Sequence, residues 1–315
     1  MEPGAIGTTT SNDEPRGEPS QVAADPPVVD FVVVMSRSRS LSVLSAVAVF
    51  LLSTESCLLS RQRYESFTTR TPLEAGQCLV LGFLGGRMKW DSEASFVRKL
   101  ALNLRAANLP HTEIETVENQ KRALALRLID NAFDRDGDGT LSDNEKQSAC
   151  IILYGLSFGG AAVVKFARQL NKKGIPIRLT IQVDSVGRND ALIPPNVQRA
   201  VNFYQPNGWF IRGEPEIRAE DPGGTNILGN HLYDYRDRDV DISHVHWFRK
   251  LGRVAHSKMS NDPEVWSRVE ELIRGELIHD YTTRSGNGNG NGTGTRLAII
   301  SGWRRNPTRP LGPGE

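Results

Sequence analysis

A serine stands between two glycines where an apolar run passes directly into a helical pattern. Residues 151–154 are apolar and rich in β-branched side chains, which is typical of a buried strand, and Gly155-Leu-Ser157-Phe-Gly159 follows at once. Apolar residues at helical spacing continue from 161 to 168. Glycines two positions before and after the serine remove the Cβ atoms that would collide in so sharp a turn, and they leave the serine Oγ exposed. The pattern predicts a nucleophilic Ser157; a plain glycine-rich turn is the alternative.

A serine hydroxyl is a poor nucleophile unless a histidine accepts its proton and a carboxylate orients that histidine. In this topology the acid and then the base are expected after the serine. Asp184 directly follows the predicted strand 177–183, and the carboxyl ends of parallel strands meet at one edge of a sheet. Asp184 is therefore the candidate acid. A capping role is its alternative, and Asp190 and Asp239 are weaker candidates.

Three of the six histidines fall between the last predicted strand and the last predicted helix, where the base belongs. His256 is the favoured base, because we expect it on a loop just ahead of a helix that begins with Asp262 as its N-cap. His244 and His246 are the alternatives, either as the base or as packing and pocket residues.

Backbone N–H groups must stabilise the oxyanion that develops during acyl transfer. The first predicted strand, residues 78–81, runs into Gly82-Phe83-Leu-Gly-Gly86, whose glycines allow a close approach of the backbone to substrate. We expect the donors to be the N–H of Phe83 and that of Phe158, the residue after the nucleophile. A plain βα turn is the alternative for the first segment.

A second motif occupies residues 134–145, DRDGDGTLSDNE, directly before the nucleophile strand. Its spacing resembles the calcium loop of EF-hand proteins, with Gly139 at the sharp turn and Ser142 at position nine. The ligands at positions one, three, five, seven and twelve are expected to be Asp134, Asp136, Asp138, the Thr140 carbonyl and Glu145. We expect a structural Ca²⁺ here and no organic cofactor; a solvated acidic loop is the alternative.

Strand and helix patterns alternate along the rest of the chain with short links. Further strands are predicted near 111–117, 201–204 and 231–235, and helices over 96–104, 120–133 and 262–278. This alternation predicts an α/β fold with a mostly parallel central sheet and helices on both faces. Residues 205–230 are expected to be a surface excursion, in which Trp209, Phe210 and Ile211 are candidates for a pocket wall or small lid.

Four segments, GFLGG, GLSFGG, QVDSV and AHSKMSNDPEVW, occur in that order and resemble the α/β-hydrolase superfamily of lipases, esterases and thioesterases. The resemblance covers about residues 76–278. It implies Ser157 as nucleophile, Asp184 as acid and His256 as base, with the N–H groups of Phe83 and Phe158 as the oxyanion hole. Leu81 departs from the family, since many lipases have histidine there. An acid directly after the strand that follows the nucleophile is similar to thioesterase-type members.

The ends of the chain differ from its centre in composition. Residues 1–34 are expected to be a disordered or mis-called extension, with Met35 as the true start, and 35–57 a signal peptide of basic residues and a short apolar run. Cys57 is a candidate lipoprotein cysteine and would then be the membrane anchor; an ordinary signal for soluble export is the alternative. The hydrolase domain is predicted over 68–282, and the Gly/Asn-rich linker and tail over 283–315.

Charge and cysteine usage narrow the function further. The net charge of +1 gives no electrostatic case for nucleic-acid binding. Three cysteines are too few for a disulfide scaffold, and Cys78 and Cys150 are expected to be small buried apolar residues.

The sequence thus predicts an exported serine hydrolase with a small-molecule or lipid-like acyl ester or thioester as substrate. Its location would be the periplasm, the cell envelope or the extracellular space. An acyltransferase with the same triad and a catalytically silent calcium-binding surface protein are the alternatives.

Overall fold

Strands and helices alternate along the chain in the computed structural model, which describes residues 62–208, 211–250 and 253–286. The strands are β1 (Cys78–Leu84), β2 (Thr112–Glu118), β3 (Cys150–Leu156), β4 (Ile177–Val183), β5 (Leu192–Ile193), β6 (Val197–Tyr204), β7 (Arg218–Ala219) and β8 (Asn226–Leu232). The helices are the 3-10 turn η1 (Tyr64–Ser66) and α2 (Phe96–Ala106), α3 (Arg122–Phe133), α4 (Asp143–Ser148), α5 (Phe158–Lys172), α6 (Trp247–Lys250), α7 (Val254–Ser260) and α8 (Pro263–Gly286). The predicted signal segment, Cys57 and the tail beyond 286 lie outside the described residues.

The central sheet has six strands in the order β2-β1-β3-β4-β6-β8, and every neighbouring pair is parallel. Parallel neighbours need crossover connections, and helices supply several of them here. The predicted α/β fold with a mostly parallel sheet is therefore confirmed, and the carboxyl ends of all six strands lie at one edge of the sheet.

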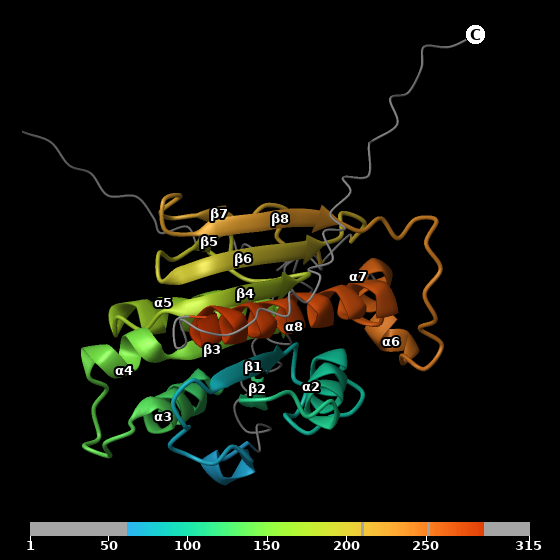
Figure 1. Cartoon of the computed structure of the whole chain (residues 1–315). Coiled ribbons are helices and arrows are strands. Elements are labelled where there is room, and N and C mark those ends of the chain that lie inside the picture. Colours follow the sequence, from blue (N-terminus) through green and yellow to red (C-terminus); the bar gives the residue numbers. More distant parts are fainter. Residues whose placement is uncertain (1–61, 209–210, 251–252, 287–315) are drawn as a thin grey trace, which may run out of the picture. The chain divides into compact units, whose positions relative to one another are not determined.

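Helices cover both faces of this sheet. Successive side chains of a strand point to opposite faces, so both faces carry apolar side chains that helices can bury. Leu79 and Leu81 of β1 belong to the core cluster under α3 and α5, whereas Val80 and Leu84 belong to the cluster under α2 and α8. Figure 1 shows α8 lying in front of the sheet, roughly along its strands, and α8 contacts both β4 and α2. Two separate apolar cores thus hold the sheet from either side.

Cys78 and Cys150 form a disulfide, so the prediction that they are merely small buried apolar residues was wrong. The two cysteines begin β1 and β3, which are adjacent, and they are direct partners in the strand register. Their Cα atoms are 4.5 Å apart although 72 positions separate them in sequence. The pairing depends on the order and register of the strands, which the cysteine count does not reveal.

The N-terminal part of the described chain covers the edge of the sheet at β2. The Gln62 side chain donates to the Thr116 carbonyl (2.7 Å) and accepts from the Glu118 amide (2.9 Å), much as a neighbouring strand would. Exposed strand edges invite pairing with other chains, and this contact protects one.

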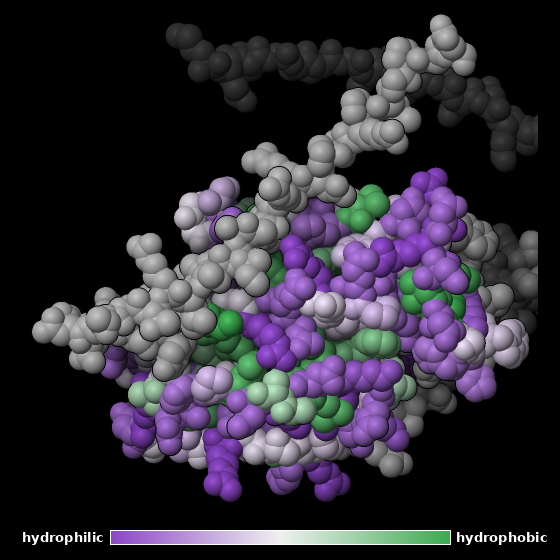
Figure 2. All heavy atoms as spheres, turned by 45° about the vertical axis from the view of Figure 1, so that its right-hand side comes forward, coloured by the Kyte–Doolittle hydropathy of each residue, from purple (hydrophilic) through white to green (hydrophobic). Residues whose placement is uncertain are grey.

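No helix among the described residues is long and apolar enough to cross a membrane. On the face in Figure 2, hydrophilic side chains predominate and the apolar ones form small separate groups.

Several elements differ from the predicted boundaries; β1 continues to Leu84, and β6 begins at Val197. Strand β8 lies at 226–232 instead of 231–235, so it begins inside the segment expected to be an excursion. Its asparagines and glycine disguise it, and Gly229 has a φ of +151° next to a register shift. Helix α8 continues to Gly286, and His256 lies within α7 instead of on a loop.

Candidate active site

Ser157 lies in a sharp turn between β3 and α5, as its flanking glycines predict. Its backbone has a φ of +57° and a ψ of −123°, a sparsely populated region for a non-glycine residue that costs about 1–3 kcal/mol. A Cβ atom on Gly155 would lie 2.4 Å from the Gly159 carbonyl oxygen, and one on Gly159 would lie 2.0 Å from the Phe83 carbonyl oxygen. Only glycine fits at either position. Because both residues lack a Cβ atom, β3 and α5 can approach closely enough to form the turn.

Hydrogen bonds to the segment around Asp184 hold this strained turn in place. The Ser157 amide donates to the Val183 carbonyl (2.9 Å), and the Val186 amide donates to the Ser157 carbonyl (3.1 Å). Asp184 itself follows β4 with a φ of +43°, and its amide donates to the Phe203 carbonyl (2.7 Å). Ser157 and Asp184 thus lie on adjoining strand ends at the carboxyl edge of the sheet.

The structure brings Asp184 and His256 together. His256 Nδ1 lies 2.6 Å from Asp184 Oδ2, and the aspartate is completely buried. Because a carboxylate can only accept, Nδ1 of a neutral His256 carries the proton and Nε2 is left as an acceptor. This is the tautomer that a general base for a serine requires.

Among the described residues, no hydrogen bond joins Ser157 Oγ to His256. Nucleophile–base pairs are often looser without substrate than in the reacting complex. Asp184 and His256 are therefore in contact, while Ser157 Oγ has no hydrogen-bonding partner among the described residues.

The alternative acids and bases have other neighbours. His244 Nε2 lies 3.0 Å from the Asn261 side-chain oxygen, and His246 lies exposed before α6. Asp190 is buried and accepts from Ser185 Oγ at 2.5 Å, whereas Asp239 is exposed.

Phe83 is unsuited to the oxyanion hole, which corrects that prediction. It lies inside β1, paired with Val117 on one side and Gly155 on the other. In an interior parallel strand each N–H serves the ladder, so this amide is not available to a substrate.

The first amides beyond β1 belong to Gly85 and Gly86. Among the described residues neither amide donates a hydrogen bond, and a Cβ on Gly85 would lie 3.3 Å from Ser157 Cβ. The N–H of Phe158 is likewise free, because Phe158 begins α5 and the first helical amides have no acceptor within the helix. The amides of Gly85, Gly86 and Phe158 are thus the candidate donors around the serine.

Asn119, which sequence reasoning missed, holds the Gly85–Gly86 turn. Its Nδ2 donates to the Leu84 carbonyl (2.9 Å) and to the Gly86 carbonyl (2.6 Å), and the side chain is buried at the end of β2. In a trans peptide the C=O and the following N–H point in opposite directions, so fixing the Leu84 carbonyl also fixes the Gly85 N–H. Its place directly after a strand was the signal that could have identified it.

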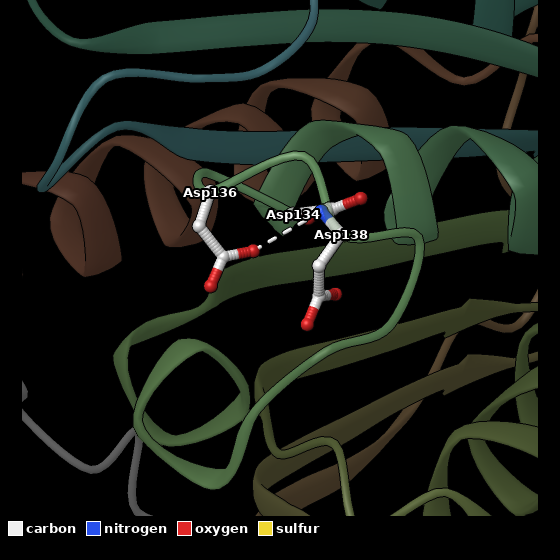
Figure 3. A group of neighbouring side chains, drawn as sticks. All are labelled: Asp134, Asp136 and Asp138. Atoms are coloured by element: carbon white, nitrogen blue, oxygen red, sulfur yellow. Dashed lines mark hydrogen bonds between the residues drawn. The ribbon is translucent and has the colours of Figure 1, made fainter.

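The acidic loop brings three of its predicted ligands together. One carboxylate oxygen from each of Asp134, Asp136 and Asp138 lies within 4.8 Å of the others, and Figure 3 shows these side chains with the bond from the Asp138 amide to Asp136. The two carboxylate oxygens of Asp134 accept from the amides of Gly137 and Gly139, both at 2.9 Å. The loop thereby curls around its own acidic groups.

Glu145, expected at position twelve, lies outside that group of three carboxylates. Its carboxylate accepts from the Ser142 hydroxyl (2.7 Å), the Ser142 amide (2.9 Å) and the Arg135 amide (2.7 Å). These hydrogen bonds, led by that of the Ser142 hydroxyl, lower the pKa of Glu145 to about 2. Thr140 donates through its amide and its hydroxyl to Asp138, which keeps it beside the acidic group.

Of the residues suggested for a pocket wall or lid, Ile211 is half-buried. Trp209 and Phe210 lie outside the described residues. One groove with a volume of about 420 Å³ lies between α2 and α8, where Phe96 stacks on Trp266. None of the predicted triad residues lines it.

The sequence matches no protein-family model and no curated protein. In structure, the chain is similar to a novel cutinase-like protein from Cryptococcus sp., with 15% sequence identity and a TM-score of 0.33. The match covers 66% of this chain and 98% of the other. A likeness of this degree does not bear on activity.

Proposed function

We propose that this chain is an exported serine hydrolase that cleaves carboxylic esters or thioesters through an acyl-enzyme. The single observation that supports this most strongly is the 2.6 Å contact between His256 Nδ1 and the buried Asp184, at the sheet edge where the strained Ser157 turn lies. A structural scaffold would not need a strained serine and a buried aspartate–histidine pair at neighbouring strand ends.

The proposed reaction begins with Ser157 Oγ attacking the acyl carbonyl while His256 Nε2 accepts the hydroxyl proton. Asp184 orients the imidazole and stabilises the imidazolium that forms. The negative charge that develops on the carbonyl oxygen is stabilised by the N–H of Phe158 together with that of Gly85 or Gly86. His256 then returns the proton to the leaving alcohol or thiol. Water, activated by His256, hydrolyses the acyl-enzyme.

The substrate class follows from this chemistry: a small-molecule or lipid-like acyl ester or thioester. An acyltransferase would use the same residues and differ only in passing the acyl group to an alcohol instead of water. Product analysis with and without an added alcohol distinguishes the two.

Export is supported by the Cys78–Cys150 disulfide, because disulfides persist mainly in oxidising compartments. It agrees with the basic and apolar segment expected to be a signal peptide, with Cys57 as the candidate lipid-anchored residue. Cell fractionation of the full-length protein, with Cys57→Ala as the comparison, tests location and anchoring together.

The decisive experiment is labelling of the full chain with a fluorophosphonate, which reacts with activated serines. We expect labelling of the wild type and its loss in Ser157→Ala and in His256→Ala. His244→Ala is the matched control, since His244 pairs with Asn261, and it should label at the wild-type rate. Circular dichroism checks that each variant is folded. A folded wild-type protein that does not label would overturn the hydrolase proposal and favour the catalytically silent scaffold.

We also propose that the acidic loop binds a structural Ca²⁺. Support comes from the three clustered carboxylates and from the spacing of the loop, whose oxygen ligands suit a hard cation. A Ca²⁺ concentration one hundred times the Kd would stabilise the folded protein by about 2.7 kcal/mol.

Calcium titration followed by thermal unfolding tests this site. The unfolding temperature should rise with Ca²⁺ in the wild type and stay constant in Asp136→Asn. Asp143→Asn is the matched control, because Asp143 is an exposed acid of the same loop that is not among the expected ligands and pairs with Lys146. An equal response of the wild type and Asp136→Asn would exclude this site.

A further inference from the structure

The carboxylate of Asp184 is held from one side only. Its Oδ2 atom lies 2.6 Å from His256 Nδ1 and accepts a second hydrogen bond, at 3.2 Å, from Gln205 Nε2. Its Oδ1 atom is buried and has no hydrogen-bonding partner among the described residues. Burying a carboxylate is costly in free energy unless hydrogen bonds compensate it. The two donors to Oδ2 therefore provide most of the compensation for the buried charge of Asp184.

Gln205 directly follows β6, the strand next to β4, and its side chain is fully buried. Its Nε2 donates both to Asp184 Oδ2 and to the Ile211 carbonyl (3.0 Å). Both partners can only accept, so the amide group must present its NH₂ and not its oxygen. This leaves Gln205 Oε1 buried without a partner among the described residues, an uncompensated polar atom that a purely structural glutamine would not need.

Gly213 closes the other side of the aspartate. A Cβ atom at this position would lie 2.2 Å from Asp184 Oδ1, and the Glu214 amide next to it donates to the Ser185 carbonyl (2.9 Å). The backbone therefore packs against Oδ1 without donating to it. Apart from His256, Gln205 is the one side-chain donor that the described residues offer to this carboxylate.

From this arrangement we infer that Gln205 is a positioning residue for the reaction: it fixes the Asp184 carboxylate so that Oδ2 faces His256, and it shares the negative charge of that oxygen. The inference rests on the proposed function. Without the amide, the carboxylate could rotate about its Cβ–Cγ bond and the full charge of Oδ2 would act on the imidazole. A merely structural Gln205 would instead serve only to tie the following loop through Ile211.

The test uses Gln205→Met, which keeps the length of the side chain but removes its donors. Gln182→Met is the matched control, because Gln182 is equally buried at the end of the neighbouring β4 and donates to the Asp190 carbonyl (3.0 Å) instead. The first readout is the imidazole N–H signal of His256 in the proton NMR spectrum, assigned by its absence in His256→Ala. The second is the pH dependence of kcat/KM for a soluble ester.

In Gln205→Met we expect the His256 N–H signal to move and kcat/KM to fall about tenfold. The midpoint of the acid limb should rise by about half a pH unit, because a carboxylate that has lost one hydrogen bond attracts the imidazolium proton more strongly. Gln182→Met should leave both the signal and the midpoint unchanged. An unchanged signal and midpoint in Gln205→Met, even with a lower unfolding temperature, would overturn the inference.

The test still gives an answer if the wild type is inactive or if Gln205→Met does not fold. The NMR readout needs no turnover, so a wild type without esterase activity would refute the proposed function while the signal still tests the positioning role. If Gln205→Met does not fold, Gln205→Glu replaces it, since the introduced carboxyl can donate to Asp184 only when protonated. The His256 signal should then match the wild type at low pH and depart from it as the pH rises; a signal that matches at every pH would overturn the inference.

Discussion

The two ends of β3 carry the two chemical features of this chain, and they are built in opposite ways. At the Cys150 end, the hydrogen bonds of the acidic loop join residues two to ten positions apart. At the Ser157 end, the contacts join Asp184 to His256 over 72 positions and Asn119 to Leu84 over 35. The acidic loop is therefore a local structure, whereas the candidate active site exists only when the whole sheet is assembled.

This difference predicts that changes at the Ser157 end alter reactivity, while changes at the Cys150 end alter stability. The following substitutions test that separation.

The largest effect is expected from Asp184→Asn. The amide cannot stabilise the imidazolium and favours the wrong tautomer of His256, so kcat should fall by about 10³–10⁴-fold while the protein stays folded. Ester hydrolysis and circular dichroism measure the two quantities. Asp239→Asn, which changes an exposed aspartate, should behave as the wild type. A comparable loss in both variants would contradict the assignment of the acid.

The next effect concerns the disulfide at the other end of β3. Replacing both Cys78 and Cys150 by alanine removes a cross-link over 72 positions, and loop-closure entropy then predicts a loss of about 4 kcal/mol in the free energy of unfolding. Denaturant unfolding measures this loss. At 25 °C the fluorophosphonate labelling rate of the folded variant should match that of the wild type. A large drop in that rate would show that the two ends are coupled.

Asn119→Ala should reduce kcat by about 10–100-fold, because the Gly85–Gly86 turn loses the side chain that fixes its carbonyls and thus its amides. Asn196→Ala is a matched control, since Asn196 also donates to two backbone carbonyls, those of Ala167 and Ile175. The control should lower the unfolding temperature without changing kcat. Equal kcat values in the two variants would show that Asn119 has no specific role at the site.

The smallest effect is the pH dependence contributed by Glu145. Its pKa is lowered from the ordinary value of 4.5 to about 2, so the unfolded chain binds the proton more readily. The stabilisation is complete above pH 4.5 and declines as the pH falls towards 2. The difference in unfolding free energy between the wild type and Glu145→Gln should therefore shrink from pH 6 to pH 3, with fluorophosphonate labelling at pH 7 unaffected. If this free-energy difference stayed constant from pH 6 to pH 3, the Glu145 carboxylate would not be the source of the pH dependence.

Part of the candidate site could be predicted without a structure because its causes are local. The glycines around Ser157 act through collisions between neighbouring backbone atoms, and the ligand spacing of 134–145 acts through turns of a few residues. The alternation of elements likewise predicts the α/β class. Phe83 was misplaced because β1 ends at Leu84, three residues later than its apolar run indicates, which commits the Phe83 amide to the ladder.

The sequence by itself thus determined the strained serine turn, the acidic loop and the parallel sheet, since each depends on residues close together in the chain. Only the tertiary structure decided that His256 and not His244 lies against Asp184, and that Cys78 pairs with Cys150. It alone also brings Asn119 to the Gly86 carbonyl and Gln205 to Asp184. These contacts depend on strand order and register. Both are set by how the two apolar cores pack on the sheet, and no short stretch of sequence records that packing.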